Sequence, residues 1–218
     1  MKACTIATAV ALLTSSTFAA SVHKRDAVSD KFQAVNVEQL TTAVSTWLLD
    51  TQGVSDFFND AANAVANADT FDTTQTSLPV EANDAFQHET NETSQKGIIE
   101  GFLCLDTACT SSISSVSIQA AKELLENGAF QSVLDQLNRI DGQGAPNIAD
   151  VSDAINIINN GNSTTDGRCA GVLFAIDTYF RAASDVIDQL GADNLLTGLE
   201  ASRPLACNGI SALSQVAS

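Results

Sequence analysis

The sequence of 218 residues predicts an all-α fold, a single-domain bundle of about seven to eight helices with two disulfides. Apolar residues recur at spacings of three and four through most of the chain, as they do along one face of a helix. We find no segment with the apolar and polar alternation of a strand. The chain has one Trp, one Tyr and three Pro, whereas a sandwich or barrel requires more aromatic and β-branched residues.

The N-terminal residues carry the pattern of a signal peptide, for which a buried helix is the alternative. Lys2 supplies one positive charge, an apolar run follows, and small residues place the cleavage site after Ala19. Lys24 and Arg25 form a dibasic pair of the kind at which kexin-type proteases trim pro-segments, with two ordinary surface charges as the alternative. These features predict a secreted, extracellular protein. The boundaries are 1–19 for the signal peptide, 20–25 for the pro-segment and 26–218 for the mature helical domain.

The first half of the mature chain predicts two short helices and one longer helical segment. Residues 34–50 carry an apolar stripe that Gly53 is expected to end, because glycine commonly follows the last turn of a helix. Ser55 can cap a second helix. Pro79 suits the first turn of a further segment, 79–105, which is polar at first and apolar towards its end. Its periodicity leaves open whether it forms one helix or two.

The second half predicts further helices that are separated by turns. Asn127 and Gly128 stop one helix, and Asn147 caps a later one. The longest apolar stripe runs from Cys169 to Leu190 and keeps the helical period over about six turns. The helices expected in this half are 114–126, 129–140, 147–158, 169–190 and a short one at 194–201.

The cysteines predict two disulfides. Cys4 leaves with the signal peptide, and Cys104, Cys109, Cys169 and Cys207 remain. An even count in a secreted chain points to disulfides, with three possible connectivities. We favour Cys104–Cys109, which would clip a helix end to the next loop, and Cys169–Cys207, which would hold the C-terminal segment against the longest helix. A metal site is the alternative, but the chain lacks Cys-x-x-Cys and has almost no His, so no metal is expected.

Charge and composition exclude several classes of partner. Loss of residues 1–25 leaves seven basic and 26 acidic residues, a formal charge of −19 compared with −16 for the whole chain. Nucleic acids and anionic lipid headgroups attract basic surfaces, so neither is an expected partner. No apolar run after the signal peptide is long enough for an integral membrane segment. Asn91 and Asn162 lie in Asn-x-Thr sequons and are candidate glycosylation sites.

Candidate catalytic residues are few. His88 is the one histidine of the mature chain, and no nucleophile-elbow motif accompanies it, so we interpret it as a solvent-facing helix residue. Glu100 beside an apolar stripe and Asp177 on the longest helix are the acids to watch for glycosidase chemistry, which requires two carboxylates at a set separation. No sequence feature predicts a cofactor.

The layout resembles small secreted proteins of filamentous fungi. The matching features are the signal peptide, Lys24-Arg25, a helical body, residues 35–60, and a segment from Arg168-Cys169-Ala170 to Phe180 that closes on Arg203 to Cys207. As architecture, the chain is also distantly similar to fungal hydrophobic surface binding proteins and cell-wall galactomannoproteins. This resemblance implies a secreted helical protein, in some cases associated with the cell wall, that binds apolar ligands or surfaces.

Three functions follow from these features. The leading one is non-catalytic binding of a lipid or other apolar ligand, or of a cell-wall or host surface, because amphipathic helices can enclose a cavity or present a face. The first alternative is an effector-type protein that acts on a host partner. The second is a carboxylate-dependent glycoside hydrolase that uses Glu100 or Asp177.

Overall fold

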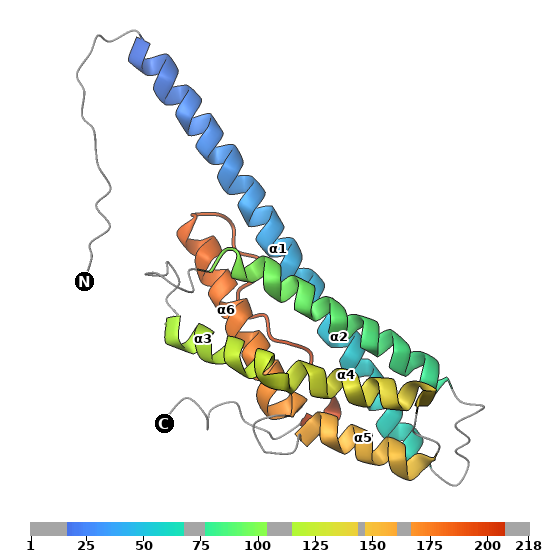
Figure 1. Cartoon of the computed structure of the whole chain (residues 1–218). Coiled ribbons are helices and arrows are strands. Elements are labelled where there is room, and N and C mark those ends of the chain that lie inside the picture. The colour runs from blue at the N-terminus through green and yellow to red at the C-terminus, as the bar shows by residue number, and fades with distance from the viewer. Residues whose placement is uncertain (1–16, 68–76, 104–114, 144–146, 161–166, 208–218) are drawn as a thin grey trace. The chain divides into compact units, whose positions relative to one another are not determined.

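The structure is a computed structural model that describes residues 17–67, 77–103, 115–143, 147–160 and 167–207. The chain divides into two units, Met1–Asn36 and Val37–Ser218. The first contributes the helical residues from Thr17 to Asn36, and the second contains the other described elements. The described residues are mostly helical and contain no strand, which confirms the all-α prediction for this part of the chain (Figure 1).

The principal helices follow one another along the chain. Helix α2 lies along α4, and α3 lies along α6 (Figure 1). The helices are α1 (Thr17–Ala66), α2 (Leu78–Glu100), α3 (Ser115–Leu124), α4 (Phe130–Asn138), α5 (Ile148–Asn160) and α6 (Leu173–Gln189). The short helical turns are η2 (Leu125–Ala129), η3 (Arg139–Gln143), η4 (Arg168–Val172) and η5 (Leu205–Cys207).

The predicted break at Gly53 is wrong, because α1 continues through it to Ala66. Gly53 instead allows α2 to approach α1 closely. A Cβ atom at this position would lie 2.5 Å from Cδ2 of the His88 ring, far inside van der Waals contact. The glycine therefore marks a helix crossing and not a helix end. The sequence left open whether segment 79–105 forms one helix or two. Up to Glu100 it forms the single helix α2, with Pro79 in the first turn, and residues 104 and 105 lie outside the described residues.

The helix predicted at 194–201 is also absent, and this segment forms turns. Asn194 uses its side chain twice, since its Nδ2 donates to the Ser184 carbonyl at 3.0 Å and its Oδ1 accepts from Leu196 N at 2.9 Å. Gly198 has a φ of 75°, which does not fit a right-handed helix. With two predicted helices fused into α1 and this one absent, the described helices are fewer than the predicted seven to eight.

Three predicted helix boundaries are confirmed. Gly128 has a φ of 100° in the kink between α3 and α4, and Gly142 has a φ of 88° after α4. These left-handed conformations favour glycine and stop each helix. The Asn147 side chain accepts from Ala149 N at 2.9 Å and Asp150 N at 3.1 Å, which caps α5 as expected.

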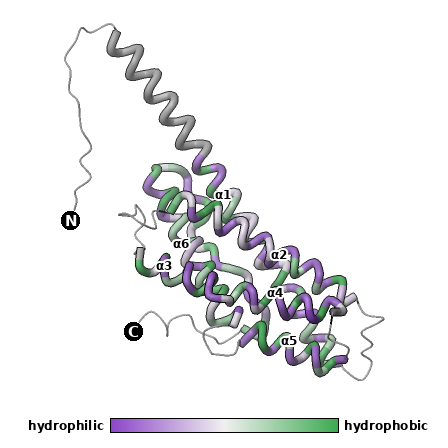
Figure 2. The backbone as a smooth tube through the Cα atoms, in the orientation of Figure 1, coloured by the Kyte–Doolittle hydropathy of each residue, from purple (hydrophilic) through white to green (hydrophobic). Residues whose placement is uncertain are grey.

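The buried apolar residues form two clusters. Figure 2 shows green and purple residues alternating along the helices, as amphipathic helices require. The first cluster surrounds Trp47 and α6. The ring centroid of Trp47 lies 5.6 Å from that of Tyr179 and 5.7 Å from that of Phe180. The second joins the Val54–Ala61 part of α1 to α4 and α5. The predicted inward faces of 129–140 and 169–190 are thus confirmed as core.

One predicted disulfide is present in the part of the chain that the structure describes. The Cys169 and Cys207 sulfur atoms are 1.98 Å apart, so η4 is joined to the C-terminal turn η5. The other predicted pair, Cys104–Cys109, lies outside the described residues, as does Asn162. Ala19, Lys24 and Arg25 fall within α1, and Asn91 is exposed on α2. No helix of the described residues has the length and apolar character that a membrane crossing requires.

Candidate functional site

Helix α2 turns a stripe of charged residues inward. Its buried residues recur at spacings of three and four, so they occupy one face of the helix. Three of the seven, Glu89, Glu92 and Lys96, are charged, and the two glutamates have no solvent exposure. Buried charges of this kind require partners, and these come from other helices. The buried residues of α2 are Leu78, Ala82, Ala85, Glu89, Glu92, Lys96 and Ile99.

Arg168 is the central partner of the two glutamates. It lies at the start of η4 and is fully buried. Its NH1 donates to Glu89 Oε2 at 2.5 Å, and its NH2 donates to Glu92 Oε1 at 3.0 Å. The planar guanidinium thus bridges two carboxylates one helical turn apart, which a lysine ammonium cannot do with the same geometry.

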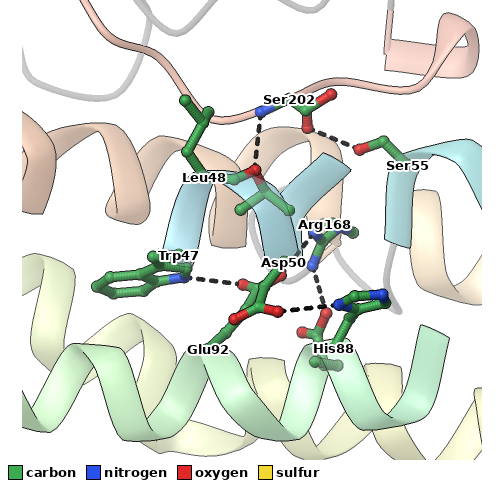
Figure 3. A network of polar contacts seen from close by, with 10 residues as sticks. Trp47, Leu48, Asp50, Ser55, His88, Glu92, Arg168 and Ser202 are labelled. Carbon is green, nitrogen blue, oxygen red and sulfur yellow. Dashed lines mark hydrogen bonds and ion pairs between the residues drawn. The ribbon is translucent and has the colours of Figure 1, made fainter. Parts of the chain in front are cut away.

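Helix α1 completes the network. Trp47 Nε1 donates to Glu92 Oε2 at 3.1 Å, and Asp50 Oδ1 lies 2.9 Å from His88 Nδ1 (Figure 3). We call Asp50, His88, Glu89, Glu92 and Arg168 the polar layer. The His88 side chain is 40% exposed and bonds the buried Asp50. The sequence interpretation of His88 as a solvent-facing residue did not include this bond.

The polar layer separates the two apolar clusters. Along α1, Trp47 belongs to the first cluster and Val54 to the second, and the buried Asp50 lies between them. Along α2, Ala85 belongs to the second cluster and Ile99 to the first. The charged residues therefore fix the register of α2 against α1 and η4, because sliding either helix would leave a buried charge without its partner.

Burial dominates the electrostatics of the layer. It raises the pKa of Glu89 well above the ordinary value, and the opposing attraction of Arg168 does not cancel the rise. Burial also raises the pKa of Glu92, against the effects of Arg168 and the Trp47 hydrogen bond. Three buried atoms of the layer have no hydrogen-bond partner, namely Asp50 Oδ2, Glu89 Oε1 and Arg168 Nε.

Glu100 is engaged in a second polar cluster. It accepts from the Tyr179 hydroxyl at 2.6 Å and pairs with Lys96 Nζ at 2.9 Å. Lys96 also bonds Glu126 at 2.8 Å, which links α2 to η2. Burial and the bond to Glu100 raise the pKa of Tyr179, so the phenol stays protonated and donates. Glu100 thus serves as an anchor for α6.

Asp177 anchors the C-terminal segment. Its Oδ1 accepts from Ala201 N at 2.7 Å, and its Oδ2 pairs with the Arg203 guanidinium. Asp177 lies two residues before Tyr179 on α6, and two residues turn a helix by about 200°. Because Tyr179 bonds Glu100, the two watched acids lie on opposite sides of α6 and are not brought together as a catalytic pair.

The network around Gly53 gives a first testable prediction. An alanine normally stabilises a helix interior by about 0.5–1 kcal/mol relative to glycine. Gly53→Ala is expected to lose this gain in the wild type, because its Cβ displaces the His88 ring from Asp50. In a His88→Ala background the gain should return. Urea unfolding of the four proteins measures the coupling, and equal effects of Gly53→Ala in both backgrounds would contradict the close contact.

Arg168, Glu89 and Glu92 are the main residues that the sequence interpretation missed. The sequence signal for the two glutamates is the helical spacing of the inward-facing positions of α2. This spacing of three and four residues continues from the apolar positions through the charged ones. As for metals, the described residues contain no group of three or more His, Cys, Asp or Glu side chains placed to hold an ion.

In comparisons with known proteins, no family model matches this chain, and neither a curated protein nor a solved structure matches it significantly. The resemblance to fungal secreted proteins therefore stays a prediction.

Proposed function

We propose that the chain is a secreted, non-catalytic protein that binds an apolar ligand or a cell-wall or host surface. The observation that carries this proposal is the engagement of every candidate catalytic side chain in bonds within the fold. Glu100 holds Tyr179, Asp177 holds Arg203 and the Ala201 N–H, and His88 faces Asp50. Groups bonded in this way stabilise the bundle and leave recognition to its surface.

The packing of the first cluster supports recognition at the surface and not inside it. Ile176, Tyr179 and Phe180 lie on the apolar face of α6, and each is at most 1% exposed. The Trp47 ring contacts two of them at the centroid distances of aromatic packing. Large apolar side chains that do reach solvent include Leu49, Val116, Leu195 and Leu205, each at least 64% exposed, and we infer that apolar contacts with the target use residues of this kind.

Native mass spectrometry of the protein secreted by its own organism is the first test. A retained adduct of lipid size, beyond the mass of glycans, supports an apolar ligand. A bare mass together with sedimentation onto insoluble wall polysaccharide or hydrophobic particles supports a surface target. A bare mass without such sedimentation would overturn the proposal in favour of the effector-type alternative.

The hydrolase alternative makes a separate prediction. Asp177→Asn is expected to lower the free energy of unfolding by about 1.5–3 kcal/mol, because it weakens charge-assisted bonds to Arg203 and Ala201. Assays on polysaccharides should show no activity in the wild type, and therefore none in Asp177→Asn. Hydrolysis by the wild type that disappears in Asp177→Asn at conditions where the variant is folded would establish the alternative.

A further inference from the structure

The polar layer contains more negative than positive charge. Asp50, Glu89 and Glu92 are at most 4% exposed, and Arg168 is the one permanent cation among the five residues of the layer. His88 is the remaining group that can carry a positive charge. An uncompensated charge inside a protein is costly, and a buried group usually changes its protonation state instead. Even with His88 protonated, the three carboxylates exceed the two cations by one.

The hydrogen bonds indicate which carboxyl group takes up the proton. Both oxygens of Glu92 accept, one from Trp47 and one from Arg168. Asp50 also has a buried oxygen without a partner, Oδ2, but its Oδ1 lies 2.9 Å from His88 Nδ1, so a ring nitrogen already faces this carboxyl group. Glu89 has one bonded oxygen, Oε2, while its buried Oε1 has no partner. A proton on Glu89 Oε1 therefore removes the excess charge without breaking a bond.

We propose that the folded chain binds a proton at Glu89, which makes the polar layer a pH-sensitive joint between α2 and η4. The charged groups that act on Glu89 are Arg168 on η4 and Glu92 on α2. Asp50 on α1 acts in turn on Glu92 and bonds His88 on α2. With the proton in place, Arg168 neutralises Glu92, so Glu89, Glu92 and Arg168 together carry no net charge. Loss of the proton leaves two adjacent carboxylates on one guanidinium, which loosens the contact of α2 with η4.

The sign of the pH effect follows from linkage. Burial raises the pKa of Glu89 in the folded state above the value of the unfolded chain, which is near 4.5. Glu89 then contributes its full stability below that ordinary pKa, and the contribution is lost as the pH rises through the folded-state pKa. Inside this window one proton changes the folding equilibrium constant about tenfold per pH unit.

The experiment measures urea unfolding from mildly acidic to mildly alkaline pH for the full chain and three variants. In the wild type the folding equilibrium constant should fall about tenfold for each unit that the pH rises within the window. Glu89→Gln imitates the protonated carboxyl group, so its folding constant should not show this fall. Glu38→Gln, an exposed glutamate outside the layer, should behave as the wild type. Asp50→Asn should keep the fall. Parallel pH dependence in wild type and Glu89→Gln, or loss of the fall in Asp50→Asn instead, would overturn the proposal.

Infrared spectroscopy of the wild type gives a second readout that does not depend on the folding of a variant. At neutral pH a protonated carboxyl group shows a carbonyl band apart from those of carboxylates. Labelling of glutamate with ¹³C should shift this band, and labelling of aspartate should not. Absence of the band, or its shift with labelled aspartate alone, would overturn the assignment to Glu89.

Discussion

Replacement of Arg168 by methionine is expected to lower the free energy of unfolding by about 3–5 kcal/mol, the usual cost of removing one partner from a buried ion pair. Arg168 is fully buried and donates to both Glu89 and Glu92. Without it the two carboxyl groups have no compensating charge, and both must take up protons for the chain to fold. The loss should therefore be largest at alkaline pH and smaller at acidic pH. Urea unfolding at two pH values measures both effects.

Two further variants identify the cause of this loss. Arg168→Lys keeps the charge but not the fork that bridges two carboxylates, so an intermediate loss is expected. The triple variant Arg168→Met, Glu89→Gln, Glu92→Gln removes the charges together and should recover much of the stability, since matched replacement of a buried ionic group is often neutral or favourable. A loss below about 1 kcal/mol for Arg168→Met, typical of surface pairs, would contradict the burial of the network.

The sequence predicted the helices better than their contacts. Helical periodicity located α4, α5 and α6, because their inward faces are apolar and the pattern is local. The same criterion described α2 as weakly periodic, since it counted apolar residues alone and three of the seven buried positions are charged. Glu89 and Glu92 become suitable core residues through Arg168, 79 and 76 residues away. No local pattern contains that information.

Gly53 illustrates the same limit. By local rules a glycine after an apolar stripe predicts a helix end. The structure uses it for contact with His88, which belongs to a different helix. The sequence singled out Glu100 and Asp177 for their apolar neighbours. Their roles in the fold depend on Tyr179, Ala201 and Arg203, which the sequence could not assign to them. The residues of the polar layer could therefore be identified only from the packing of the helices in the structure.

Removal of the Cys169–Cys207 bridge by replacing both residues with alanine is expected to lower the free energy of unfolding by about 4 kcal/mol. The bridge spans 38 residues, and closing a loop of this length restricts the unfolded chain by roughly that amount. In the folded state the C-terminal segment keeps other contacts with α1. Ser55 Oγ donates to the Ser202 carbonyl at 2.7 Å (Figure 3). Ser202 N donates to Thr51 Oγ1 at 3.1 Å.

The control uses a Cys104→Ala, Cys109→Ala background, in which a reductant can act on Cys169–Cys207 but not on the other predicted pair. Reduction there should reproduce the loss of the double replacement at 169 and 207. A protein lacking all four cysteines should not respond to the reductant. Equal urea midpoints with and without reductant in the first background would contradict a stabilising role of the bridge.

Combining the replacement of Cys169 and Cys207 by alanine with Arg168→Met distinguishes two interactions that stabilise the position of η4. Arg168 and Cys169 are neighbours in the same turn, yet the guanidinium acts on the folded state and the bridge acts mainly on the unfolded chain. If so, the two losses should add within about 0.5 kcal/mol despite the adjacency, as they do for independent sites. A combined loss well below the sum would mean that the bridge also positions Arg168 between Glu89 and Glu92, so that a reducing environment would weaken the polar layer as well.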